Sequence, residues 1–191
     1  MVTPQEVNEF WIKEVGPKGW YLQDEALDRR IRERFLPAWE EAAAGGLKDW
    51  KLTPEGLLAY LILLDQFPRN MFRGDDPRAF ATDRRARACA KQGIERGWDM
   101  RVPEPERQFY YLPLMHSECL TDQDRCVRLM LTNMPETGAD NLRHAKAHRE
   151  VIRRFGRFPY RNAALSRKDT DAERAFIANG GYASVIRAVP A

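Results

Sequence analysis

The chain has 191 residues, of which 43% are apolar and 31% are charged, and its formal net charge is +3. This balance suits one globular domain with a substantial core, and it is not basic enough to indicate a nucleic-acid partner by itself. The three cysteines form no C-x-x-C pair, which argues against a disulfide scaffold or a cysteine zinc site.

The N-terminus has no basic start followed by an apolar run, and the longest apolar run, Leu57–Leu64, has eight residues. We therefore expect no signal peptide and no membrane span. The sequence predicts a cytoplasmic protein without a membrane partner.

Helix signals dominate the first half of the chain. Thr3–Glu6 reads as a capping box that opens a short helix. A second helix is predicted from Asp24 to Leu36, with a kink or restart at Pro37 and an end at the glycine pair after Ala44. A third helix opens at residues 53–54, is apolar on nearly every side and stops before Pro68, which predicts the buried centre of the domain.

The second half continues this pattern. The expected elements are a helical region from Asp76 to Gly93 or Gly97, an apolar helix over residues 109–120 with a kink at Pro113, an amphipathic helix over residues 139–155 capped by Gly156, and a last helix opened by the capping box at Thr170. Strand signals are nearly absent, so the predicted class is all-α.

Basic residues concentrate in one part of the chain. From Arg143 to Lys168 there are nine lysines and arginines and one acid, a local net charge of +8, which leaves −5 for the rest. A segment of this kind is typical of a solvated helix face and, less often, of a site for an anion.

The helix around His148 has an apolar arc that contains His148, with most basic residues on the other face. A buried histidine with a hydrogen-bond partner and a catalytic or ligand-binding histidine both fit this pattern. His144 precedes His148 by four residues, a spacing that can hold a metal, but no glutamate follows His144 and two histidines do not complete a site. We therefore expect no metal and no cofactor.

The stretch His116-Ser117-Glu118 lies in the predicted apolar helix, where an ionised carboxylate needs a partner. Adjacent helical residues do not face each other, which argues against a dyad of Ser117 with His116. The catalytic candidates are His116, Glu118 and His148.

Two Phe-Pro stretches, DQFPRN at 65–70 and RFGRFPYRN at 154–162, echo each other. Asp65 shares an apolar arc and needs an arginine partner, for which Arg69, Arg157 and Arg161 are candidates. In a structural interpretation the prolines redirect helices and the asparagines cap turns. In a functional interpretation the arginines converge on an anionic ligand. The candidate ligand-binding residues are Asp65, Gln66, Arg69, Asn70, Arg154, Arg157, Arg161 and Asn162.

The segments LILLDQFPRNMFRG, AFATDRRA, ERQFYYLPLMHSE and AHREVIRRFGRFPYRNAALSRKDT resemble an uncharacterised bacterial family, domain of unknown function 924. The resemblance covers nearly the whole chain and implies a tetratricopeptide-like array of antiparallel helical hairpins, but no reaction. The chain departs from the family in two places. It has Tyr160 where the family usually has histidine, and Leu165-Ser166-Arg167 where Leu-Gly-Arg is usual.

We therefore expect a single all-α domain over residues 1–191 in which Asp65, His116, Glu118, His148 and Arg161 lie near one another. The leading functional hypothesis is a binding or scaffold protein whose arginine-rich site takes an acidic peptide or a phosphate-bearing small molecule. The alternative is a small-molecule hydrolase with His116 or His148 as general base. Nucleic acid is the partner that the sequence favours least, because exposed aromatic residues are not interleaved with the basic ones.

Overall fold

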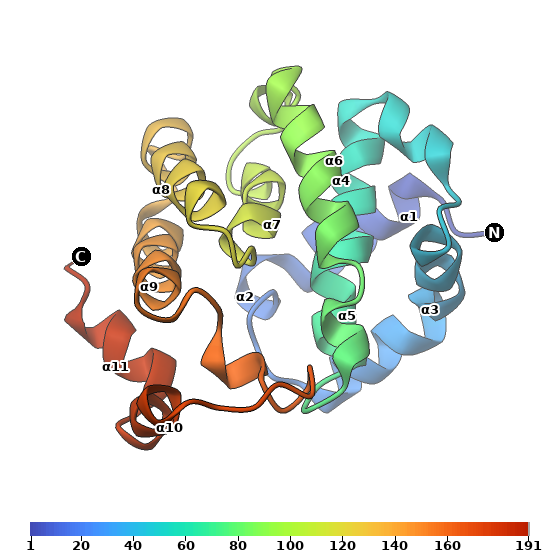
Figure 1. Ribbon diagram of the computed structural model, residues 1–191. Coiled ribbons are helices and arrows are strands. Elements are labelled where there is room, and N and C mark those ends of the chain that lie inside the picture. The colour runs from blue at the N-terminus through green and yellow to red at the C-terminus, as the bar shows by residue number, and fades with distance from the viewer. Residues whose placement is uncertain (191) are drawn as a thin grey trace. The chain divides into compact units, whose positions relative to one another are not determined.

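The structure, a computed structural model, describes residues 1–190, and in this range every regular element is helical (Figure 1). The predicted all-α class is therefore confirmed. Contacts divide the chain into two compact units: the first comprises Met1–Arg73 and Pro77–Pro113, and the second comprises Gly74–Asp76 and the chain from Leu114 onward. The prediction of one domain stays a prediction. No helix in the described range is long and apolar enough to cross a membrane.

The first unit is built from short helices. They are α1 (Pro4–Asn8), the π-helical η1 (Glu9–Val15), α2 (Gly16–Gly19), α3 (Glu25–Ala43), the 3-10 helix η2 (Lys48–Leu52), α4 (Pro54–Leu61), the π-helical η3 (Ile62–Gln66), α5 (Phe67–Met71), the 3-10 helix η4 (Pro77–Phe80), α6 (Asp83–Glu95), and the 3-10 helices η5 (Asp99–Arg101) and η6 (Glu106–Tyr110). The short helix α7 (Leu112–Met115) follows, and the boundary between the two units falls within it, after Pro113.

The centre of the first unit is α4, as its apolar sequence predicts. All of its residues from Leu57 to Leu61 are buried, and α6 packs beside it (Figure 1). An aromatic cluster extends this core, because the ring of Phe35 lies 5.1 Å from that of Phe10 and 4.8 Å from that of Phe67. Contacts of this kind between aromatic rings add to the stabilisation from area burial.

Two prolines lie inside helices. At Pro37 the predicted restart is absent, but α3 continues to Ala43 and ends next to the glycine pair, as predicted. The predicted stop before Pro68 is absent: α4 runs through the π-helical η3 into α5. Pro68 has no N–H to donate to the carbonyl of Leu64, and the hydroxyl of Thr82 donates to that oxygen instead, at 2.6 Å. A residue far along the chain thus removes the penalty that would have ended the helix.

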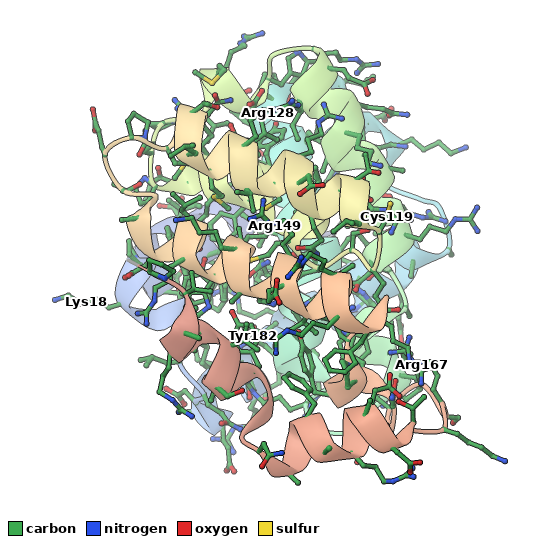
Figure 2. All side chains as sticks on the ribbon, turned by 60° about the vertical axis from the view of Figure 1, so that its left-hand side comes forward. Lys18, Cys119, Arg128, Arg149, Arg167 and Tyr182 are labelled. Carbon is green, nitrogen blue, oxygen red and sulfur yellow. The ribbon has the colours of Figure 1, made fainter. Side chains whose placement is uncertain are left out.

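The second unit contains five elements: α8 (Leu120–Asn133), α9 (Ala139–Phe155), the 3-10 helix η7 (Pro159–Arg161), α10 (Asp171–Ala178) and α11 (Gly181–Ala188). Helices α8 and α9 form an antiparallel hairpin, and α11 packs against α9 (Figure 2). A core shared by α9, the segment after it, α10 and α11 contains Val151, Ile152, Phe158, Phe176 and Val185.

Local signals predicted α9 and α10 well. Gly156 caps α9 in the left-handed conformation, with φ of 68°, and Thr170 forms the capping box of α10 with Glu173. Two expectations were wrong. The apolar helix ends at Met115, so His116 and Glu118 lie in an irregular segment. The helix opened by Thr170 is also not the last, because α11 follows it.

Candidate functional site

The DQFPRN stretch lies in the first unit, where Asp65 is 1% exposed and has the predicted arginine partner. The guanidinium of Arg69 approaches Oδ1 of Asp65 at 3.3 Å, and its Nη2 also donates to both oxygens of Asp83 at 3.0 Å. The side-chain amide of Gln66 donates to Oδ2 of Asp65. Arg69 thus stabilises two carboxylates of the first unit.

Asn70 forms a second polar group in the same unit. Its side-chain amide donates to Asp28 at 2.8 Å, and Arg73 donates to both oxygens of the same carboxylate. Asp28 is buried, so these partners offset the desolvation of its charge. These contacts are structural, but they differ from the predicted structural interpretation, because the helix continues through Pro68 and Asn70 binds a distant carboxylate instead of capping a turn.

In the second unit, Glu118 is the centre of a network that joins the irregular segment after α7 to the RFGRFPYRN stretch. It accepts bonds from the backbone N–H of Phe158 at 2.8 Å and from Arg167 at 2.7 and 3.0 Å. Burial acts to raise the pKa of Glu118, but the bonds from Arg167 and Phe158 outweigh it, so the pKa is lowered and the carboxylate stays charged.

Arg161 and Asn162 are both buried, and each has a partner in this unit. The guanidinium of Arg161 lies 4.4 Å from the centre of the Phe158 ring, and it donates to the backbone carbonyl of His116 at 3.1 Å. The side chain of Asn162 donates to Asp169 at 2.6 Å. These contacts fix the turn that follows η7.

The end of α9, the loop after it and the start of α10 border an open pocket of about 410 Å³. It is lined by Arg154, Phe155, Arg157, Thr170, Ala172 and Glu173. Arg157 donates through Nε and Nη2 to the two oxygens of Glu173, at 2.6 and 2.8 Å. These bonds, against some opposition from burial, keep the pKa of Glu173 well below its usual value, so its carboxylate is ionised at neutral pH.

All three histidines of the chain, His116, His144 and His148, lie in the second unit. The ring of His148 lies 5.4 Å from that of Phe158 and 6.3 Å from that of His116. Tyr182, at the start of α11, lies beneath α9 in Figure 2. Its hydroxyl is 2.6 Å from Nδ1 of His144 and 3.1 Å from Nδ1 of His148.

The tautomer of His148 follows from these distances. Its Nδ1 lies 2.9 Å from the carbonyl oxygen of His144, and a carbonyl can only accept, so Nδ1 carries the proton. In that tautomer Nε2 is the acceptor nitrogen. Burial, with smaller effects from His116 and Arg161, lowers the pKa of His148 to about 3, so the ring is neutral at physiological pH.

Four of the five residues predicted to cluster are therefore close in the second unit: His116, Glu118, His148 and Arg161 all touch Phe158 or a neighbour of it. Asp65 belongs to the first unit, and its proximity to the others stays a prediction.

Sequence reasoning missed Tyr182 and the role of Arg167. The capping box before α10 gave no sign of a further helix, and Arg167 looked like one more member of a basic segment. Within residues 1–190, no set of three or more histidine, cysteine, aspartate or glutamate side chains is arranged to hold a metal ion.

Residues 7–181 match the family described as bacterial protein of unknown function, DUF924. The chain belongs to this family. It is also similar to a solved structure, the protein of unknown function ATU0120 from Agrobacterium tumefaciens. The two sequences are 42% identical, the match covers 93% of this chain and 97% of that one, and the TM-score is 0.85. No curated protein matches the sequence.

Tyr160, where the resemblance implied histidine, lies beside Phe158 and Tyr182. Its ring stacks on Phe158, with centroids 5.3 Å apart, and meets the ring of Tyr182 edge-on at 6.1 Å. Tyr160 is 39% exposed, so its side chain forms part of the outer surface of this region.

Proposed function

We propose that this protein binds a small anionic molecule, with a phosphate or carboxylate group, in the pocket between the end of α9 and the start of α10. One observation supports this proposal above the others: two guanidinium groups line the pocket, and each is held by a carboxylate along one edge while N–H groups on its other edge have no partner within residues 1–190. A volume of about 410 Å³ is in the range of small-molecule sites.

Arg154 is the more available of the two arginines. Its Nε donates to Glu150 at 2.7 Å, and neither of its Nη atoms has a partner in the described chain. Its side chain is 50% exposed. A fork of N–H donors in this arrangement matches the two oxygens of a phosphate or carboxylate.

Arg157 presents a smaller donor edge. Its Nε and Nη2 are taken by Glu173, and Nη2 also donates to the carbonyl of Lys168 at 2.8 Å. Its Nη1 has no partner among the described residues. Because Glu173 fixes the guanidinium before a ligand arrives, little side-chain freedom is lost on binding.

The charge around the pocket is positive. Among the residues that line it, Arg154 and Arg157 are positive and Glu173 is negative, so the lining carries one positive charge in excess. Phe155 supplies an apolar wall, and its ring packs on Phe176 at 4.8 Å. This combination favours a ligand with both an anionic group and an apolar part.

Calorimetric titration with inorganic phosphate and with citrate, at constant ionic strength, tests the proposal. Arg154→Gln removes a lining charge, and Arg153→Gln is the matched control, because Arg153 pairs with the same Glu150 and is not among the residues lining the pocket. We expect affinity to fall about tenfold or more in Arg154→Gln, as loss of a charged hydrogen bond implies, and to change little in Arg153→Gln. An equal loss in both variants, or no binding by the wild type, would refute it.

The finer architectural prediction, a tetratricopeptide-like array, is part of the same proposal. The α8–α9 hairpin supports it, since stacked hairpins of this type commonly present a concave binding surface. An acidic peptide is the alternative ligand. It is tested by titrating the wild type and the same two variants with a poly-glutamate peptide in place of the small anions.

A second candidate function is acid–base catalysis at His148, as in the predicted hydrolase. It is favoured by the protonation pattern: Nδ1 donates to a carbonyl, and Nε2 has no hydrogen-bond partner in the described part of the chain. A histidine oriented in this way offers Nε2 as an acceptor for the proton of a water or hydroxyl group.

A further inference from the structure

His148, Tyr182 and His144 are connected by consecutive hydrogen bonds. While His144 is neutral, Nδ1 of His148 carries a proton and donates it to the carbonyl oxygen of His144, and the same N–H faces the hydroxyl of Tyr182 at 3.1 Å. The hydroxyl oxygen therefore accepts from His148. Its own proton is left to donate to Nδ1 of His144, 2.6 Å away, which makes that nitrogen an acceptor. In this series of bonds His148 donates, Tyr182 both accepts and donates, and Nδ1 of His144 accepts.

His148 and His144, at the two ends of this series of hydrogen bonds, differ in exposure and in the charged groups around them. His144 is exposed, whereas His148 is partly buried against Phe158. His116 and Arg161 act against a positive charge on His148. At the other end, burial lowers the pKa of His144; Asp140, in the first turn of α9, acts against this effect, and Arg143 adds to it. A proton taken up at His148 is therefore more stable at His144.

The position of Tyr182 is held by the packing of α11 on α9. Arg143 donates to the carbonyl of Ile186 at 2.8 Å, and the ring of Tyr182 lies 4.7 Å from that of His148. Burial raises the pKa of the Tyr182 hydroxyl. Tyr182 thus stays protonated and can pass a proton on only by accepting another at the same time.

We propose that His148, Tyr182 and His144 form a proton relay that serves a substrate or water bearing an O–H group at Nε2 of His148. The proposal rests on the second candidate function, acid–base catalysis at His148. Nε2 takes the proton from the O–H group, the proton on Nδ1 passes to the oxygen of Tyr182, and the original hydroxyl proton of Tyr182 passes to Nδ1 of His144. The O–H group becomes an anion, His148 and Tyr182 remain neutral, and His144 becomes an imidazolium.

In this scheme Tyr182 and His144 are positioning residues, and only His148 meets the substrate. The relay has two proton arrangements, and the protonation state of His144 determines which one is populated. When His144 is neutral, His148 carries its proton on Nδ1. When His144 is protonated, its Nδ1–H faces the oxygen of Tyr182, whose hydroxyl then donates to Nδ1 of His148. The bond from Nδ1 of His148 to the carbonyl of His144 is lost in this arrangement, and the His148 proton lies on Nε2.

Nitrogen-15 NMR of the histidine side chains tests this directly, in the whole protein and without ligand. The chain has three histidines; His116→Gln identifies the signals of His116, and His144→Gln identifies those of His144, which leaves the third set for His148. At pH 8 we expect His148 in the Nδ1–H form. As the pH falls and His144 becomes charged, most of the His148 population should change to the Nε2–H form while remaining neutral.

Tyr182→Phe removes only the hydroxyl group from the relay. In this variant His148 should keep the Nδ1–H form at every pH, and His144 should be protonated at a higher pH, because a donor that favoured its neutral form is gone. Tyr160→Phe is the matched control, since it removes a hydroxyl from a neighbouring tyrosine of the same unit and should leave the coupled change intact.

The possible failures are distinguishable. If His148 keeps Nδ1–H in the wild type while His144 is protonated, or if the coupled change persists in Tyr182→Phe, the relay is overturned and His148 alone stays a candidate base. If His148 is in the Nε2–H form at pH 8, both the relay and acid–base catalysis at Nε2 are overturned.

Discussion

The low pKa of His148 has a measurable consequence for stability. In an unfolded chain a histidine has a pKa of 6.5, and in the folded protein the pKa of His148 is lowered to about 3. Between these values the unfolded state binds a proton that the native state does not. The stabilisation from a neutral His148 is therefore complete above about pH 6.5 and is lost progressively as the pH falls toward about 3.

The magnitude follows from linkage. For a pKa of 6.5 in the unfolded state and about 3 in the folded state, the free energy of unfolding falls by about 2 kcal/mol between pH 7 and pH 5 because of this residue. The substitution His148→Gln removes the titration and keeps a side-chain N–H that can donate to the carbonyl of His144. The variant should therefore lose about 2 kcal/mol less than the wild type over the same pH interval.

Urea unfolding followed by far-ultraviolet circular dichroism at pH 7, 6 and 5 measures this difference. His144 and the carboxylates titrate in both proteins, so their effects cancel in the comparison of wild type with variant. For each protein, the free energy of unfolding at pH 8 is the reference, because His148 is neutral there in both the folded and the unfolded state. Parallel stability curves from pH 7 to pH 5 would show that His148 is not held neutral, and would refute the reasoning from its burial.

Two further predictions concern the second unit and the domain organisation. Glu118→Gln should destabilise the protein by about 2 kcal/mol in urea unfolding at pH 7, because it weakens charged hydrogen bonds from Arg167. Glu150→Gln is the control: its two arginine partners, Arg153 and Arg154, are exposed, so this variant should have a much smaller effect. A loss as small as that of the control would mean that the Glu118 network adds little. All five tryptophans lie in the first unit, so fluorescence reports on that unit, whereas circular dichroism reports on both. If residues 1–191 form one domain, the two signals should give the same urea midpoint, and two separate transitions would contradict this.

Local sequence signals predicted the elements whose ends depend on near neighbours. The capping boxes at Thr3 and Thr170 and the glycine cap at Gly156 each satisfy backbone groups within a few residues, and all three are present. The apolar character of α4 likewise predicted its burial, because a helix without a polar face has to be enclosed. The requirement of Asp65 for an arginine was also sound, since Arg69 is one helical turn away.

Predictions failed where a partner lies far along the chain. The helix at Pro68 continues because Thr82 satisfies the carbonyl of Leu64. Glu118 depends on Arg167, 49 positions later, and nothing local distinguishes that arginine from its basic neighbours. Helices α8 and α11 were not predicted, and without α11 Tyr182 had no apparent relation to the histidines.

The sequence by itself thus determined the helical class, the caps of individual helices and the presence of histidines and arginines in one region. The tertiary structure decided which of these side chains meet. Tyr182 reaches His144 across 38 positions of the chain, and Arg157 reaches Glu173 across 16. Helix formation is governed by hydrogen bonds between residues a few positions apart, whereas side-chain tautomers and pKa values depend on burial and on partners that only the packing of helices brings together.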